Sequence, residues 1–242
     1  MSQQRQEAEY ILLLDTGDAL VGGGLLGDRT QGQAVVAAMN LIGYDAMSLG
    51  PKELSLGPDL LRQRMQEAGF PMLSANVVLR GTEQLFAPPT VILERGGYRF
   101  GIVGLTRPEN ESASGFEVRD PVQAAIRYVS ELTEQTEIVI VLTNLGYQAA
   151  FDLANRIPDI DLVIAALPNA IPQQALQAPE TGALVVTADQ PFPGHSGRRV
   201  GRLVVTIEGD GMMRLDAWQS VAMDGTIADD PQMDELLDRF RP

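Results

Sequence analysis

The sequence of 242 residues contains no cysteine, a single histidine and a single lysine. The absence of cysteine excludes disulfides and zinc sites with thiolate ligands. A single imidazole cannot supply the several histidine ligands that catalytic zinc, iron and two-metal sites use. That histidine, His195, lies in a segment rich in proline and glycine. We therefore interpret it as an exposed loop residue rather than as the base of a Ser-His-Asp triad.

Positive charge and long apolar runs are also scarce. The chain has 18 lysine and arginine residues against 32 aspartate and glutamate residues, which gives a formal net charge of −14. This balance disfavours binding to nucleic-acid phosphates and to anionic membranes. No apolar run is long enough to cross a bilayer, and residues 1–9 are polar, without the apolar stretch of a signal peptide. We predict no nucleic-acid partner and no membrane insertion, and the cellular compartment stays open.

The residues that are present follow strand and helix patterns in turn. Helices are expected at 31–42, 59–68, 120–134, 148–156 and in the acidic C-terminal segment. Strands are expected at 10–15, 45–49, 71–77, 137–142, 161–165, 182–188, 199–208 and 212–221, with a hairpin formed by 90–94 and 98–104. Alternating strands and helices followed by a strand-rich part predict a layered α/β fold. Since no repeat, low-complexity tract or linker interrupts the chain, we predict a single domain over residues 1–242.

Several blocks of the sequence resemble, in order, the motifs of one enzyme family. Residues 12–22 resemble Leu-Asp-x-Gly-Asp-x-x-x-Gly, and residues 44–57 resemble Tyr-Asp-Ala…Gly-Asn-His-Glu-Phe-Asp-x-Gly. Residues 70–77 read Phe-Pro-Met-Leu-Ser-Ala-Asn-Val, a further motif of that family, and 101–106 and 158–164 also fall in register. In this ordered set the chain resembles the calcineurin-like metallophosphoesterases of the 5′-nucleotidase type.

The resemblance implies a fold and a chemistry. The family has a four-layer α-β-β-α sandwich with the site at the ends of the central strands. Its chemistry rests on two divalent ions roughly 3.5–4 Å apart, which bind phosphate and generate a hydroxide nucleophile. The family's first ligand motif, Asp-x-His, belongs to a strand upstream of Tyr10, and we expect the chain to lack that strand. A protein partner, a second copy of the chain or a longer N-terminus would fit the edge left exposed there.

The resemblance also indicates that most metal ligands are replaced. Asp18 matches the bridging aspartate of the second motif. In the third motif a proline and Lys52 stand in place of the asparagine and histidine, and Ser55 replaces the aspartate that partners the histidine. Asn144 occupies the histidine position of the fourth motif, and Asn169 lies in the fifth, where the family has Gly-Gly-His-Ser/Thr-His. We therefore predict a vestigial site made of Asp18, Lys52, Asn144 and Asn169, with Asp18 as the one recognisable ligand.

These replacements predict a site without metal. A protonated ammonium cannot coordinate a cation, and one carboxylate with two amide oxygens cannot hold a pair of transition-metal ions. We therefore predict that the chain has no metal cofactor, with Mn²⁺ or Zn²⁺ involved only if it is active. Lys52 would instead neutralise Asp18 as an ion pair, because a buried carboxylate without a counter-charge is costly. The alternative is that Lys52 points into solvent.

Three functions stay open. The first is a degenerate, non-catalytic domain that serves as a structural or binding subunit, which we favour because nearly every ligand is replaced. The second is a metal-dependent phosphoesterase of the 5′-nucleotidase type with an altered metal site. The third is a binder of phosphate or another anion in the vestigial cleft, with Lys52 as its anion contact. Relatives in this family are often exported, although we expect no signal peptide in this chain.

Overall fold

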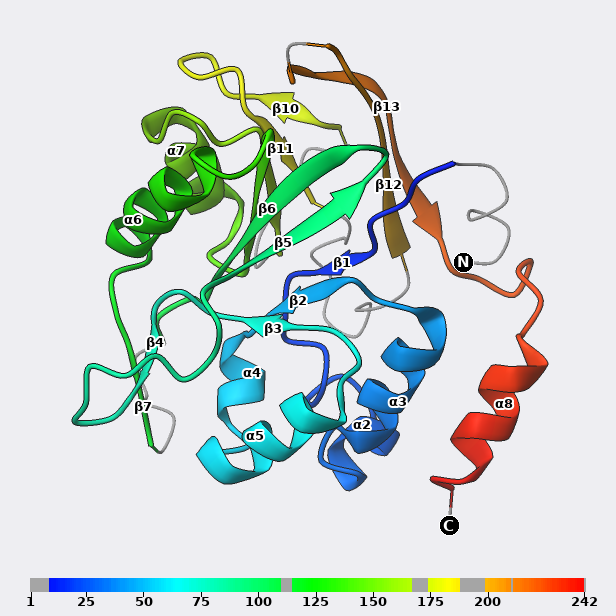
Figure 1. The fold of residues 1–242 in the computed structure, drawn as a ribbon. Helices are drawn as coiled ribbons and strands as arrows, with labels where there is room; N and C mark the ends of the chain where they lie inside the picture. The colour runs from blue at the N-terminus through cyan, green and yellow to red at the C-terminus, as the bar shows by residue number, and fades with distance from the viewer. Residues whose placement is uncertain (1–8, 110–114, 167–173, 188–198, 210, 242) are drawn as a thin grey trace.

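A computed structural model describes residues 9–109, 115–166, 174–187, 199–209 and 211–241 (Figure 1). The helices are α2 (Leu25–Arg29), α3 (Gln33–Ile42), α4 (Pro51–Leu54), α5 (Pro58–Glu67), α6 (Pro121–Thr133), α7 (Tyr147–Arg156) and α8 (Pro231–Asp238). The strands are β1 (Leu14–Asp15), β2 (Ala46–Ser48), β3 (Met72–Leu73), β4 (Val77–Leu79), β5 (Thr90–Arg95), β6 (Tyr98–Leu105), β7 (Phe116–Val118), β8 (Ile138–Thr143), β9 (Leu162–Ala165), β10 (Leu176–Gln177), β11 (Leu184–Val186), β12 (Arg199–Ile207) and β13 (Met213–Ala222). None of the described helices is long and apolar enough to cross a membrane.

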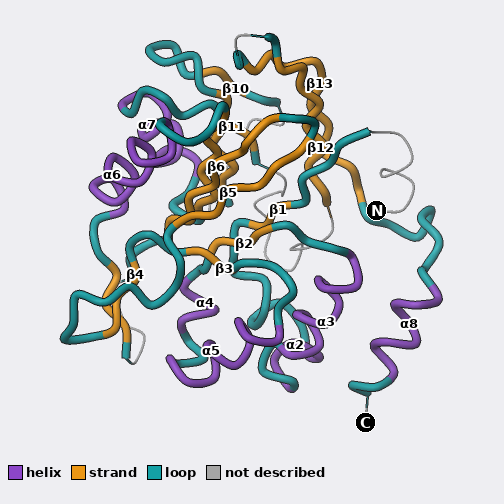
Figure 2. Tube along the Cα trace, in the orientation of Figure 1, coloured by secondary structure: helices purple, strands orange, loops and turns teal. Residues whose placement is uncertain are grey.

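Two sheets lie at the centre of the fold, as Figure 2 shows. The smaller sheet has the order β1-β2-β3, and both of its pairs are parallel. The larger sheet has the order β10-β11-β9-β8-β6-β5, with antiparallel pairs at its two edges and parallel pairs between them. Helices α2 to α5 lie beside the smaller sheet, whereas α6 and α7 lie beside the larger one (Figure 1). The α/β class predicted from the sequence is therefore confirmed.

The side chains of β8 show how the two sheets pack. Val139 and Val141 join one core cluster with residues of α6 and α7. Ile138, Ile140 and Leu142 point to the opposite face, where they pack with residues of β2 and β3. Neighbouring side chains in a strand point to opposite faces, and here the helices cover one face and the smaller sheet covers the other. Because both faces are buried, the strand has a continuous apolar run. A third cluster packs β2 and β3 against α3 and α5, so the cores follow a helix, sheet, sheet, helix order.

Gly104 of β6 allows the two sheets to approach closely. A Cβ atom at this position would lie 2.6 Å from both the Cβ and the carbonyl oxygen of Leu73 on β3. Any larger residue would therefore push the sheets apart.

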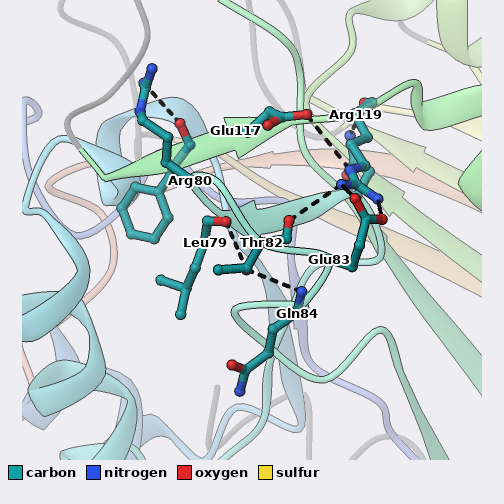
Figure 3. Close-up of polar contacts among 9 residues, drawn as sticks. Leu79, Arg80, Thr82, Glu83, Gln84, Glu117 and Arg119 are labelled. Atoms are coloured by element: carbon teal, nitrogen blue, oxygen red, sulfur yellow. Dashed lines mark hydrogen bonds and ion pairs between the residues drawn. The ribbon is translucent and has the colours of Figure 1, made fainter.

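A separate antiparallel ribbon of β4 and β7 projects from the body (Figure 1). Figure 3 shows its polar contacts. The guanidinium of Arg119 pairs with the carboxylate of Glu83 and lies 3.7 Å from that of Glu117, and Arg80 donates to the carbonyl oxygen of Phe116 at 2.9 Å. The ion pairs of Arg119 are exposed, so we expect them to fix the ribbon's register more than to add stability.

The long hairpin of β12 and β13 is tied to the centre by apolar side chains. Leu203, Leu215 and Trp218 are partly buried against the core cluster between the two sheets. Its two strands pair over their whole length, with a bulge between Val204 and Val205. The two strands expected at 199–208 and 212–221 are thus present, and the structure adds that they pair with each other as a hairpin.

Some expected elements differ in the structure. The strand expected at 71–77 divides into β3 and β4, because the Ser74 amide donates to the Pro88 carbonyl oxygen and leaves the ladder. Of the strand expected at 10–15, β1 forms the ladder with β2, and Leu13 before it accepts a 2.8 Å hydrogen bond from the Asp45 amide. Helices α2 and α4 and strands β7 and β10 were not expected, and all are short enough to leave little periodic signal.

Candidate functional site

Three of the predicted site residues meet at the carboxyl ends of the central strands. Asp18 follows β1, Lys52 is the second residue of α4 after β2, and Asn144 follows β8. The Lys52 amide donates to Asp18 Oδ1 at 2.9 Å. The Asn144 side chain donates to the carbonyl oxygens of Thr16 and Leu49, both at 3.1 Å. Parallel strands bring their carboxyl ends to one edge, which explains why segments so distant in sequence converge.

Asp18 has an unusual backbone conformation. Its φ angle is +62°, in the left-handed region that few residues other than glycine adopt. The preceding Gly17 has φ +95°, and a Cβ there would lie 2.6 Å from the Ser48 carbonyl oxygen. A Cβ at Gly50 would overlap Asp18 Oδ1 itself. The tight backbone around Asp18 therefore fixes where its carboxylate lies. We call residues 16–22 the Asp18 loop.

Glu53 of α4 binds the main chain of the Asp18 loop. Its fully buried carboxylate accepts hydrogen bonds from the amides of Asp18 (2.7 Å), Ala19 (2.9 Å), Leu20 (2.9 Å) and Gly50 (2.8 Å). Burial raises the pKa of Glu53 to about 7, against the lowering effect of these amide donors, and the charge of Asp18 raises it further. Glu53 was not among the predicted site residues, although its position in the 44–57 motif was visible in the sequence.

The side chain of Lys52 does not make the ion pair that the sequence suggested. Its ammonium lies 3.4 Å from the Gly22 carbonyl oxygen, and its stem covers Gly22. Within the described residues, the contact between Lys52 and Asp18 is made by the Lys52 main-chain amide. Ser55, which replaces the aspartate of the family motif, donates its hydroxyl to the Lys52 carbonyl oxygen at 2.6 Å. Lys52 thus supports Asp18 through its backbone, and its side chain, in a partly buried residue, extends to the Gly22 carbonyl oxygen.

Asn144 is a brace between strand ends. It is 2% exposed, and its Oδ1 accepts a 2.7 Å hydrogen bond from the Arg107 amide at the end of β6. With its bonds to Thr16 and Leu49 it connects the ends of three strands. The Thr106 hydroxyl donates to the same Leu49 carbonyl oxygen at 2.8 Å. The amide group is therefore engaged at both its oxygen and its nitrogen.

Asp15 caps the turn that leads into the Asp18 loop. Its Oδ1 accepts a 2.8 Å hydrogen bond from the Gly17 amide, which closes the turn after β1. Burial raises the pKa of Asp15 to about 6, with a further contribution from Asp18, and burial beside Asp15 raises the pKa of Tyr44 to about 12.

Comparison with known proteins gives the family. No protein-family profile matches the chain. The chain is 31% identical to a probable 5′-nucleotidase of Treponema pallidum over 66% of this chain and 28% of the relative. It is 30% identical to protein UshA of Escherichia coli over 67% of this chain and 31% of the relative. A 5′-nucleotidase precursor from Thermus thermophilus superimposes with a TM-score of 0.84 at 27% identity, covering 99% of this chain and 50% of that one. The calcineurin-like phosphoesterase YfkN of Bacillus subtilis superimposes with a TM-score of 0.76 at 21% identity, covering 99% of this chain and 85% of that one.

The chain belongs to the calcineurin-like metallophosphoesterases of the 5′-nucleotidase type. The resemblance read from the sequence motifs is thereby confirmed. The chain spans less than a third of the two curated relatives named above, so the activity of a whole protein of this family is not transferred with the fold.

Family membership corrects one prediction. From the replaced ligands we predicted no metal cofactor, but the relatives are 5′-nucleotidases and calcineurin-like phosphoesterases, a class that needs divalent metals. The prediction of no cofactor is therefore wrong. Among the described residues there is, however, no group of three or more histidine, cysteine, aspartate or glutamate side chains that could hold an ion. These residues do not by themselves fit a two-metal centre, and ligands additional to Asp18 would lie outside them.

Two predicted positions cannot be placed in this site. Asn169, the fourth residue of the predicted site, and His195 both lie outside the described residues. The grouping of Asp18, Lys52 and Asn144 is a structural fact, and their role in a functional site stays a prediction.

Proposed function

We propose that this chain is the phosphoesterase domain of a 5′-nucleotidase-like protein, a metal-dependent hydrolase of phosphoric esters with an altered metal site. The observation that carries the proposal is the geometry of Asp18. This carboxylate stands at the strand ends of a phosphoesterase fold, and two neighbouring segments hold it in a strained conformation. Strained residues persist where the surrounding structure over-determines them, and they cluster at functional sites.

The chain offers one group for a divalent ion and one for the phosphate of a substrate. Asp18 supplies a carboxylate, with Oδ1 held by the Lys52 amide. The Lys52 ammonium beside Gly22 supplies a positive charge that would attract the phosphate of a substrate. In this family bound divalent metal polarises the phosphoryl group, but the described residues do not define where such an ion would lie.

The experiment is an assay of phosphate release from nucleoside monophosphates and from a simple aryl phosphate, with Mn²⁺, Zn²⁺ or Mg²⁺. We expect metal-stimulated turnover that Asp18→Asn abolishes. Asp59→Asn is the matched control, because Asp59 is a fully exposed carboxylate on α5 whose partner is Arg62. Absence of metal-stimulated release with every substrate would refute the proposal.

A second candidate is a binding or structural subunit without turnover. Two observations favour it: Lys52 replaces a histidine of the family motif, and Asn144 is engaged as a brace between strands. A domain of this kind that binds anions through Lys52 would be protected by inorganic phosphate against thermal unfolding, and Lys52→Ala would remove the protection. Phosphate protection without turnover would select this candidate over the first.

A further inference from the structure

Positive charge is scarce at the ends of the central strands. The described segments that follow β1, β2, β6 and β8 are residues 16–24, 49–57, 106–109 and 144–146. Within these segments the positively charged side chains are those of Lys52 and Arg107. In a chain with a formal net charge of −14, a cation at this edge is a specific place for an anion to bind.

The main chain of Arg107 is fixed beside the segment that carries Asp18. Its amide donates to Asn144 Oδ1 at 2.7 Å, and the Asn144 side chain donates to the Thr16 carbonyl oxygen at 3.1 Å. Pro108 follows, and the residue before a proline is restricted to extended conformations. The base of the Arg107 side chain is therefore joined through one amide side chain to Thr16, the first residue of the Asp18 loop.

The guanidinium of Arg107 has a partner that an anion can displace. Its Nη2 lies 2.9 Å from Glu109 Oε1, and the two side chains are 31% and 50% exposed. An exposed ion pair of this kind is weak, because water solvates both charges and salt screens them. A phosphate group offers two oxygens to the planar fork of an arginine, which is the stronger, bidentate arrangement.

We propose that Arg107 binds the phosphate group of a phosphoester or of free phosphate at the strand ends, and that Glu109 pairs with Arg107 while no anion is bound. The inference deepens the proposed function and rests on its claim that a phosphate group binds at this edge. It does not require turnover, so binding alone tests it.

A purely structural ion pair makes a different prediction. If Arg107 and Glu109 only close the loop after β6, replacing either residue should affect stability alike and leave the affinity for phosphate unchanged. If Glu109 competes with phosphate for Arg107, the two replacements should change that affinity in opposite directions.

The test is calorimetric titration of the chain with inorganic phosphate at constant ionic strength. We expect Arg107→Gln to weaken binding at least about tenfold, the equivalent of one hydrogen bond to a charged group. We expect Glu109→Gln to strengthen binding about two- to fivefold, which matches the loss of an exposed ion pair. Unchanged affinity in Arg107→Gln would overturn the inference.

The chain offers a matched control for both changes of charge. Arg239 and Glu235 of α8 form an exposed pair with the same 2.9 Å separation, on a helix that packs against α3. Arg239→Gln and Glu235→Gln should leave the affinity for phosphate unchanged. An effect in these variants as large as at Arg107 and Glu109 would reduce the result to net charge and overturn the inference.

A double variant tests the competition itself. If Glu109 acts through Arg107, the gain from Glu109→Gln should disappear once Arg107 is already glutamine. A gain that persists in the double variant would mean that Glu109 repels the anion directly, which would overturn its pairing role. Arg107→Lys covers the case in which Arg107→Gln does not fold: it keeps the charge without the fork, and we expect an intermediate affinity.

The two sources of the phosphate group are separated by a second titration, with a nucleoside monophosphate. Tighter binding than that of inorganic phosphate, with the same dependence on Arg107, would identify the ester as the ligand, and equal binding would identify free phosphate. Arg107-dependent binding without turnover would support this inference and refute the proposed hydrolase. Turnover with unchanged affinity in Arg107→Gln would do the reverse, and a wild-type chain that binds neither compound would overturn the inference.

Discussion

Gly50 shows how one missing side chain can shape a site. Its φ of −108° is accessible to any residue, so the need for glycine is steric and comes from the Asp18 carboxylate beside it. We expect Gly50→Ala to lower the free energy of unfolding by about 1–3 kcal/mol, as overpacking does, measured by urea denaturation. Gly23→Ala is the control, because a Cβ there would meet no atom within 4 Å. Equal stabilities of the two variants would mean that the Asp18 loop adjusts freely.

A substitution at Lys52 separates the contribution of its backbone amide to stability from that of its side chain. The sequence suggested an ion pair with Asp18, but the structure assigns that contact to the Lys52 amide, which alanine retains. We therefore expect Lys52→Ala to change the free energy of unfolding by less than about 1 kcal/mol, through lost packing of its stem on Gly22. A loss above about 2 kcal/mol would indicate an ion pair with Asp18 in solution.

At the scale of elements, Asn144 connects strand ends of the smaller sheet with strand ends of the larger sheet, and no ladder joins these two sheets in the described part of the chain. Its three hydrogen bonds reach the segments after β1, β2 and β6, and the residue is buried. We expect Asn144→Ala to cost about 2–4 kcal/mol of unfolding free energy, because buried partners lose their bonds. Gln148→Ala, which removes an exposed amide on α7 that pairs with Asp152, should cost less than about 0.5 kcal/mol. A neutral Asn144→Ala would show that the strand ends are held by other contacts.

The ion pair of Arg99 and Glu137 should make the stability of the fold depend on pH. Arg99 donates to Glu137 from its side chain at 2.6 Å and from its amide at 2.8 Å, which lowers the pKa of Glu137 from 4.5 to about 2. Since the folded pKa is the lower one, this stabilisation is complete above pH 4.5 and disappears as the pH falls toward 2. Thermal unfolding should therefore show Glu137→Gln as less stable than wild type near pH 7, with the difference shrinking between pH 4.5 and 2. A constant difference, or one unaffected by salt, would contradict this.

The elements differ in how far the sequence predicted them. Helix α6 was found almost to the residue, because Asp120 caps it with bonds to the Val122 and Gln123 amides and Pro121 occupies its first turn. Helix α4 was missed, since a four-residue helix has no periodicity. The site residues, too, were predicted only where the sequence carries a recognisable pattern. Motif order predicted Asp18, but the bond from the Lys52 amide and the four bonds of Glu53 depend on the three-dimensional path of the loop.

At the scale of the whole molecule, the prediction of a single domain is still to be tested. The hairpin of β12 and β13 is the part in question, because its own two strands make most of its contacts. Trp218, the single tryptophan of the chain, lies on β13 and packs partly buried against the core between the sheets. Its fluorescence therefore reports whether the hairpin is docked, while far-UV circular dichroism reports the helices, which lie elsewhere in the fold.

We expect the two signals to follow one urea transition, because Leu203, Leu215 and Trp218 of the hairpin pack against the core cluster between the sheets. Leu203→Ala should move both curves together to lower urea. We expect it to lower the free energy of unfolding by at most about 3 kcal/mol, since Leu203 is only partly buried. If the fluorescence changed at lower urea than the circular dichroism, the hairpin would be a separate unit and the single-domain prediction would be wrong. Coincident curves in both proteins would mean that the hairpin and the two sheets unfold as one cooperative body.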